Sequence, residues 1–140
     1  MNDEQMMKDI LLSAKTVASV GLSSNPAKES FGIVAYLKGQ GYRVIPVNPT
    51  TTEVLGETSY PDLESVPEKI DVVQVFRKPE DVPPVVDSAI KVGAKVVWMQ
   101  EGIVHEEAAA KARAAGLQVV MDACMRATHR ALIGERLKRF

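Results

Sequence analysis

The sequence predicts one α/β domain, a Rossmann-like doubly wound parallel sheet of five strands in the order 3-2-1-4-5. Three observations support this predicted fold. Apolar runs of strand length recur along the chain, and stretches of helical length separate them. Glycines end three of those stretches just before the next apolar run. A length of 140 residues suits one domain, spanning 1–140, with a core of its own.

The five apolar runs are rich in valine, whose branched side chain favours a buried strand. In such a sheet, ligands bind at the carboxyl ends of the strands, next to the first strand. The loops that follow the five runs are therefore the candidate binding segments. The runs cover residues 16–22, 42–47, 71–76, 94–99 and 117–121.

The helices between these strands have recognisable ends. Ser30 is expected to cap a helix that stops at Gly39 or Gly41, and the next two helical stretches begin with acidic residues and end at Gly93 and Gly116. A leading helix is expected over about residues 3–14 and a trailing one over about 126–138. The connection over 50–67 is expected to be irregular, with a short helix near 61–66.

Composition excludes several classes of protein. A formal net charge of −1 argues against a general nucleic-acid binder. The first 15 residues lack the basic start and long apolar run of a signal peptide, and no apolar stretch approaches the roughly 20 residues that cross a bilayer. With Cys124 as its single cysteine the chain forms no intrachain disulfide. We expect a cytoplasmic protein that binds neither membrane nor nucleic acid.

The first loop, "GLSSNPAKES", connects strand one to a helix whose N-terminus attracts phosphate groups. Gly21 permits a close turn and Lys28 supplies a positive charge. Hydroxyl donors come from Ser23, Ser24 and Ser30. The loop lacks the G-x-G-x-x-G pattern of dinucleotide-binding turns, so a plain connection capped by Ser30 is the alternative interpretation.

The second loop, "PVNPTTT", disfavours NAD, because an NAD-binding unit places Asp or Glu there to accept hydrogen bonds from the ribose. Asn48 can bond a ribose, a phosphate or an amide, although Asn48 and Pro49 are also typical of a simple turn.

In the third loop Phe76 and Arg77 stand side by side. This pair is suited to an adenine ring and a phosphate, and solvated surface charge is the alternative interpretation.

The fourth loop brings Gln100, Glu101 and Gly102 to the same edge, and Gly102 lets a ligand approach the backbone. Trp98 stands within an apolar run and is expected in the core. The fifth loop adds Asp122 and Cys124 near the same rim.

Together the segments "GLSSNPAKES", "PVNP", "VFRKPEDV", "VWMQEG" and "MDAC" resemble the small CoA-binding proteins whose fold is that of the N-terminal domain of the succinyl-CoA synthetase alpha subunit. The resemblance spans about residues 10–134. It implies coenzyme A bound across the carboxyl edge of the sheet. By the same resemblance, the first loop meets the pyrophosphate end. The remaining implied contacts are Asn48 and Pro49 along the nucleotide, Phe76, Arg77 and Val82 beside the adenosine or pantetheine, and Gln100 with Gly102 closing the pocket.

One position departs from that family. Many relatives read Asp-Arg-Cys where this chain reads Asp122, Ala123 and Cys124, so either Arg126 replaces the missing arginine or the pocket is less cationic. The phosphohistidine-bearing second domain of the synthetase subunit has no counterpart in these 140 residues. Forming a thioester would therefore require another protein chain.

We expect a module that binds CoA or an acyl-CoA without catalysis of its own. The alternative is an enzyme that uses NAD(P) or another adenine nucleotide. Two thiol hypotheses also stay open: Cys124 as a nucleophile paired with His129 or His105, and a mixed disulfide between Cys124 and the thiol of bound CoA. The segment "HEEAA" does not match the H-E-x-x-H zinc motif, so no metal site is expected.

Overall fold

A computed structural model describes residues 2–134 of the chain and confirms the predicted α/β class. Five parallel strands form the central sheet, in the order β2-β1-β5-β6-β7. The arrangement is Rossmann-like, and each strand falls within one of the five valine-rich runs. The strands are β1 (Thr16–Val20), β2 (Arg43–Val47), β5 (Val72–Val75), β6 (Val96–Met99) and β7 (Gln118–Val120).

The predicted strand order is wrong at one end of the sheet. Counted along the chain, the five strands run 2-1-3-4-5 rather than 3-2-1-4-5, because β5 pairs with β1 and not with β2. Pro46 explains why β2 stays at the edge. Its carbonyl faces away from β1 and accepts the Tyr60 N–H at 3.1 Å. A further full strand on that side would need the backbone N–H of residue 46 as a donor, and proline has none.

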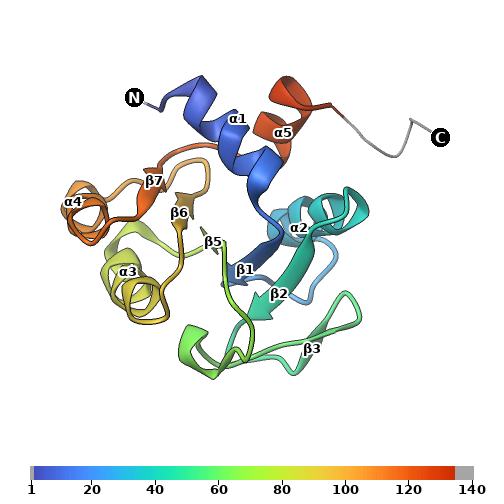
Figure 1. Cartoon of the computed structure of the whole chain (residues 1–140). Helices are drawn as coiled ribbons and strands as arrows, with labels where there is room; N and C mark the ends of the chain where they lie inside the picture. Colours follow the sequence, from blue (N-terminus) through green and yellow to red (C-terminus); the bar gives the residue numbers. More distant parts are fainter. Residues whose placement is uncertain (1, 135–140) are drawn as a thin grey trace.

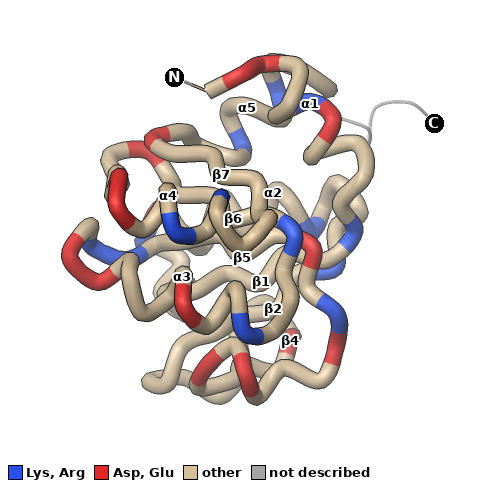
Figure 2. Tube along the Cα trace, turned by 60° about the vertical axis from the view of Figure 1, so that its left-hand side comes forward, with Lys and Arg blue, Asp and Glu red and all other residues tan. Residues whose placement is uncertain are grey.

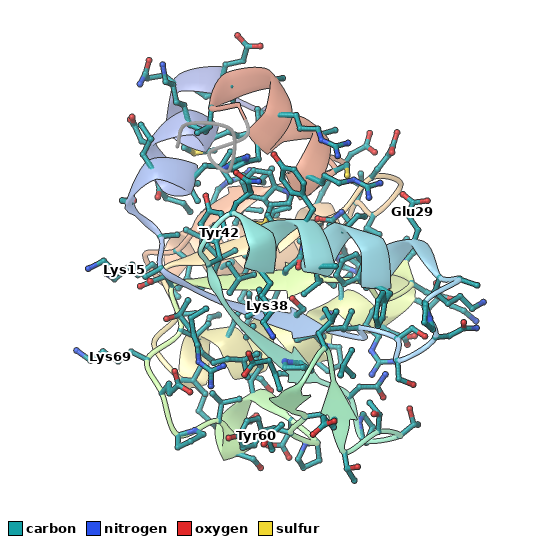
Figure 3. All side chains as sticks on the ribbon, turned by 90° about the vertical axis from the view of Figure 1, so that its right-hand side faces the viewer. Lys15, Glu29, Lys38, Tyr42, Tyr60 and Lys69 are labelled. Atoms are coloured by element: carbon teal, nitrogen blue, oxygen red, sulfur yellow. The ribbon has the colours of Figure 1, made fainter. Side chains whose placement is uncertain are left out.

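A small hairpin lies beside this edge, where an irregular connection was expected. It pairs β3 (Glu53–Val54) with β4 (Glu57–Thr58) in antiparallel fashion. The two residues of its turn, Leu55 and Gly56, both have positive φ, the geometry of a type I′ turn. Tyr60, which is labelled in Figure 3, follows the hairpin. It forms an isolated parallel bridge to Val47. The predicted short helix is present as the 3₁₀ turn η1 (Leu63–Ser65).

Five α-helices of the described residues cover the sheet on both faces (Figure 1). Side chains of α3 and α4 pack on one face, and those of α1, α2 and α5 pack on the other. A 3₁₀ turn, η2 (Pro79–Asp81), leads into α3. The helices are α1 (Glu4–Ser13), α2 (Glu29–Gly39), α3 (Val82–Lys91), α4 (Glu106–Ala114) and α5 (Met125–Leu132). Residues 135–138 of the predicted trailing helix lie outside the described residues.

Alternating side chains of the strands feed two apolar layers, as expected for a parallel sheet covered on both faces. Val73 and Val97 pack with α3 and α4, whereas Val17 and Trp98 pack with the other three helices. Trp98 is fully buried, as predicted, and its Nε1 donates to the carbonyl of Ala123 at 2.8 Å.

The expected cap of α2 is wrong. Lys28 occupies the N-cap position without a side-chain hydrogen bond, and Ser30 lies inside the first turn. The Ser30 Oγ instead accepts the backbone N–H of Ser23 at 3.1 Å, which closes the first loop onto its own helix. Polar capping does occur at α1 and α4, where Asp3 and His105 accept backbone N–H groups.

Charged residues of both signs alternate over the view in Figure 2 without separating into regions of one sign. Among residues 2–134, no helix has the length and apolar character that crossing a bilayer demands.

Candidate functional site

The site begins where β1 and β5 end side by side. Gly21 has φ +90°, and a Cβ placed there would lie 2.7 Å from the carbonyl oxygen of Phe76. The same Cβ would lie 3.3 Å from Nε of Arg77. Only glycine fits such an approach, because it has no side chain and tolerates positive φ. The predicted close turn is therefore present, and it sets the third loop against the first.

Two cavities open at this carboxyl edge. Their volumes are about 370 Å³ and about 440 Å³, both above the lower limit of roughly 300 Å³ for small-molecule pockets. The first cavity is lined by Val20, Val47, Pro49, Pro61, Asp62, Leu63, Arg77, Asp81, Pro84, Val85 and Ser88. The second cavity is lined by Gly21, Ser23, Lys28, Glu29, Ser30, Ile33, Phe76, Arg77, Gln100, Glu101 and Ile103.

Arg77 lines both cavities and connects them. It is partly buried, and no hydrogen bond or ion pair joins its guanidinium to another residue of the described chain. An arginine in this state has five N–H donors available to a ligand. A phosphate would match it well, since guanidinium and phosphate form paired charged hydrogen bonds.

The first loop forms one wall of the second cavity. Ser23 and Ser30 line it, and so does Lys28, whose positive charge lies at the N-terminus of α2. Figure 3 shows Glu29 at this end of α2, with Lys15 and Lys69 at the opposite side of the molecule. Ser24 is exposed and lines neither cavity.

The second loop serves mainly to hold the first. Nδ2 of Asn48 donates to the carbonyl of Leu22 at 3.0 Å, and its Oδ1 accepts both the N–H and the hydroxyl of Thr50. Asn48 thus uses its amide within the protein, while Pro49 lines the first cavity.

Two further predicted residues lie behind the cavity walls. Val82 is fully buried in the layer below α3 and lines neither cavity. Gly102 lies outside both cavities, and its N–H donates to Oδ1 of Asp122 at 2.7 Å. That contact joins the fourth loop to the fifth, so Asp122 shapes the edge of the site from a distance.

The predicted thiol residues are not brought together at the cavities. Cys124 is partly buried and lines neither of them. Nδ1 of His105 accepts the N–H of Ala108, and Nδ1 of the buried His129 bonds the hydroxyl of Tyr36 at 2.7 Å. Within residues 2–134, no cluster of three His, Cys, Asp or Glu side chains has the arrangement of a metal site.

Arg126, the proposed replacement for the missing arginine, reaches the start of α2. A Cβ on Gly32 would lie 3.3 Å from its Nη1. The Arg126 guanidinium therefore approaches the wall that carries Ile33, but it does not line either cavity.

Several lining residues were missed by sequence reasoning. Pro61, Asp62 and Leu63 come from the connection after β4, which the Tyr60 bridge brings to the carboxyl edge. Pro84 and Ser88 come from α3. The two prolines at the start of α3 are evident in the sequence. That this helix faces the first cavity, however, depends on β5 lying next to β1.

A third, smaller cavity of about 90 Å³ lies at the amino ends of the strands and includes Asp71 and Lys95. Burial acts to raise the pKa of the Asp71 carboxyl, but backbone N–H groups of Lys15 and Thr16 and the charge of Lys95 outweigh it. The pKa of Asp71 is therefore lowered. This shift reflects a structural link between β1 and β5.

An ion-pair network fixes the hairpin to the sheet. Arg43 contacts Glu68 and Glu57, and the hydrogen bonds that Arg43 donates to Glu68 are the main cause of its raised pKa. The pKa of Glu57 is lowered, chiefly by Lys38 and also by Arg43. These groups lie outside the two cavities of the carboxyl edge, and they hold the segment that leads to Pro61.

Comparison with known proteins adds independent findings. Residues 15–130 match the family model described as the CoA binding domain. The uncharacterized protein YneT of Bacillus subtilis (strain 168) is 38% identical over 123 residues, which cover 88% of this chain and 91% of that protein.

A solved structure of a hypothetical protein from Pyrococcus horikoshii OT3 is 41% identical, with a TM-score of 0.92, and the match covers 95% of this chain and 94% of that one. The ADP-forming acetate–CoA ligase II of Archaeoglobus fulgidus is 31% identical over 83 residues, which amount to 58% of this chain and 12% of the ligase.

Proposed function

The chain belongs to the CoA-binding domain family, and from this membership we propose that it binds coenzyme A or an acyl-CoA at the carboxyl edge, without catalysis of its own. The match to the ligase bears out the resemblance to the succinyl-CoA synthetase alpha-like proteins that the five loops indicated. The family membership makes CoA binding plausible for this chain, and the ligand itself is part of our proposal.

Arg77 is the observation that carries the proposal. Its guanidinium has no partner among the described residues, and it lies between two cavities of small-molecule size. A ligand with an anionic centre between two larger groups fits this arrangement, and CoA has its pyrophosphate between the 3′-phosphoadenosine and the pantetheine arm. Its pyrophosphate would bind Arg77, with Lys28 and the N-terminus of α2 adding positive potential.

The first cavity suits the adenine. Its walls include Pro49, Pro61 and Val85, which offer flat apolar contact to a ring. The carboxylates of Asp62 and Asp81 line the same cavity and are acceptors for an exocyclic amino group. The pantetheine arm would then extend past Gly21 into the second cavity.

The non-catalytic role rests on the extent of the match to the ligase. The matching region is 12% of that protein, so it corresponds to a small module of a much larger enzyme. Such a module would deliver, hold or sense CoA, and any chemistry would come from elsewhere.

Calorimetric titration of the purified chain with CoA, acetyl-CoA, NAD, NADP and ATP tests the proposal. We expect binding of CoA or its thioester and none of NAD or NADP. Preference for a nicotinamide cofactor would contradict the proposal and favour the enzyme alternative.

The variant Arg77→Ala locates the binding site. Loss of a charged hydrogen bond to phosphate should weaken CoA binding by about tenfold to a hundredfold, equivalent to about 1.5–3 kcal/mol. Arg113→Ala is the matched control, because Arg113 is exposed on α4 and lines neither cavity. Equal CoA affinity in the two variants would remove Arg77 from the site.

A further inference from the structure

A chain of buried polar side chains crosses the sheet below the second cavity. The Ser19 hydroxyl donates to Oε1 of Gln74 at 2.8 Å, and Nε2 of Gln74 donates to Oε1 of Gln100 at 3.0 Å. Ser19 and Gln74 are fully buried, and Gln100 is 4% exposed. Such a network holds its members in one orientation, since each needs its partner in low dielectric.

The orientation of the Gln100 amide follows from a backbone donor. The N–H of Met125, at the start of α5, donates to Oε1 of Gln100 at 3.2 Å. A backbone N–H can only donate, so the oxygen of Gln100 must face Met125 and the nitrogen must face the other way. Gln100 lines the second cavity, and Nε2 is the polar atom of its side chain left to face that cavity.

Nε2 of Gln100 has no acceptor among the described residues, although the side chain is more than nine-tenths buried. The cavity around it has apolar walls from Ile33, Phe76 and Ile103. Because the donor groups of Nε2 are accessible and have no acceptor in the described chain, a ligand that brings an acceptor to this point can form a hydrogen bond there.

We propose that Gln100 donates a hydrogen bond to the thioester carbonyl of an acyl-CoA, and that the second cavity thereby selects acyl-CoA over free CoA. This inference rests on the proposed function. Glu29 and Glu101 line the same cavity and balance the charges of Lys28 and Arg77, so a neutral carbonyl is an acceptor that this cavity can hold once the pyrophosphate occupies Arg77. The thiol of free CoA is a poor substitute, because sulfur is a weak acceptor.

The first test varies the ligand and leaves the chain unchanged. Acetyl-CoA and S-ethyl-CoA have similar size, but the second carries a methylene in place of the carbonyl. Calorimetry should show acetyl-CoA binding about fivefold to tenfold more tightly than S-ethyl-CoA, the effect of one neutral hydrogen bond. Equal affinities would overturn the inference and leave CoA binding intact. Failure of all three of acetyl-CoA, S-ethyl-CoA and CoA to bind would overturn the proposed function itself.

The variant Gln100→Glu tests the donor directly. Its carboxylate still accepts from Gln74 and Met125, but at pH 8 it has no N–H to offer the ligand. Acetyl-CoA affinity should fall to the level of S-ethyl-CoA, and free CoA should lose less than acetyl-CoA does. Equal weakening of all three ligands would overturn the thioester assignment in favour of a pantetheine contact.

Gln118→Glu is the matched control, because Gln118 is exposed at the amino end of β7. It should retain the preference for acetyl-CoA over S-ethyl-CoA. Thermal unfolding of both variants checks that each remains folded. If Gln100→Glu does not fold, the comparison of acetyl-CoA with S-ethyl-CoA on the unmodified chain still tests the thioester contact.

Discussion

Substituting Gly21→Ala perturbs the point where the first and third loops meet. The backbone there has φ +90°, which costs a residue with a Cβ about 1–2 kcal/mol. The new Cβ would also overlap the Phe76 carbonyl oxygen at 2.7 Å, an overpacking worth about 1–3 kcal/mol. The free energy of unfolding should therefore fall by about 2–5 kcal/mol.

Gly116→Ala separates the two causes. Gly116 has φ +93°, close to that of Gly21, but no atom lies within 4 Å of a Cβ placed there. Urea denaturation should show a loss of about 1–2 kcal/mol for Gly116→Ala, from the backbone alone. A loss for Gly21→Ala no greater than that for Gly116→Ala would refute the close approach of Gly21 to Phe76.

Two further predictions concern stability. Asn48→Ala removes the hydrogen bond to Leu22 and the acceptor of two hydrogen bonds from Thr50. The free energy of unfolding in urea should therefore fall by about 1–3 kcal/mol. An unchanged value would contradict the role of Asn48 in linking the first two loops. Asp71 has a lowered pKa in the folded chain, so its contribution is present above the ordinary carboxyl pKa of about 4 and is lost as the pH falls through the folded value. Urea titrations across this pH range should show that the free energy of unfolding falls less steeply with acid in Asp71→Asn than in the unmodified chain. Parallel curves for the two proteins would contradict this role of Asp71.

Strand positions were predictable because each strand is a short valine-rich run buried on both faces. Their order was not, since local patterns do not say which neighbour a strand chooses. Pro46 is the one local signal, because proline within a strand favours an edge. Giving it more weight would have placed β2 at the edge and β5 beside β1.

The hairpin before Tyr60 escaped prediction for a different reason. Its strands have two residues each, too few to show alternation, and its turn uses Leu55 where asparagine or glycine is usual. Lys38 stabilises the turn by donating to the Leu55 carbonyl at 2.6 Å, a tertiary contact with no local signature.

Part of the site was predictable. Gly21, Arg77 and Gln100 line a cavity as the carboxyl-edge rule for α/β sheets indicates. Two other expected contacts lie elsewhere: Val82, placed by family resemblance alone, lies in the core, and the Asn48 amide bonds its own loops. The network behind Gln100 required knowledge of side-chain orientation across three strands.

The central claim is that CoA binds at the carboxyl edge, and amide chemical-shift mapping during titration with CoA tests it most directly. We predict that the largest shifts fall on Gly21, Arg77 and Gln100, with little change at Asp71 and Lys95 beside the small cavity of the opposite edge. Shifts confined to the amino edge, or none at saturating CoA, would contradict the account.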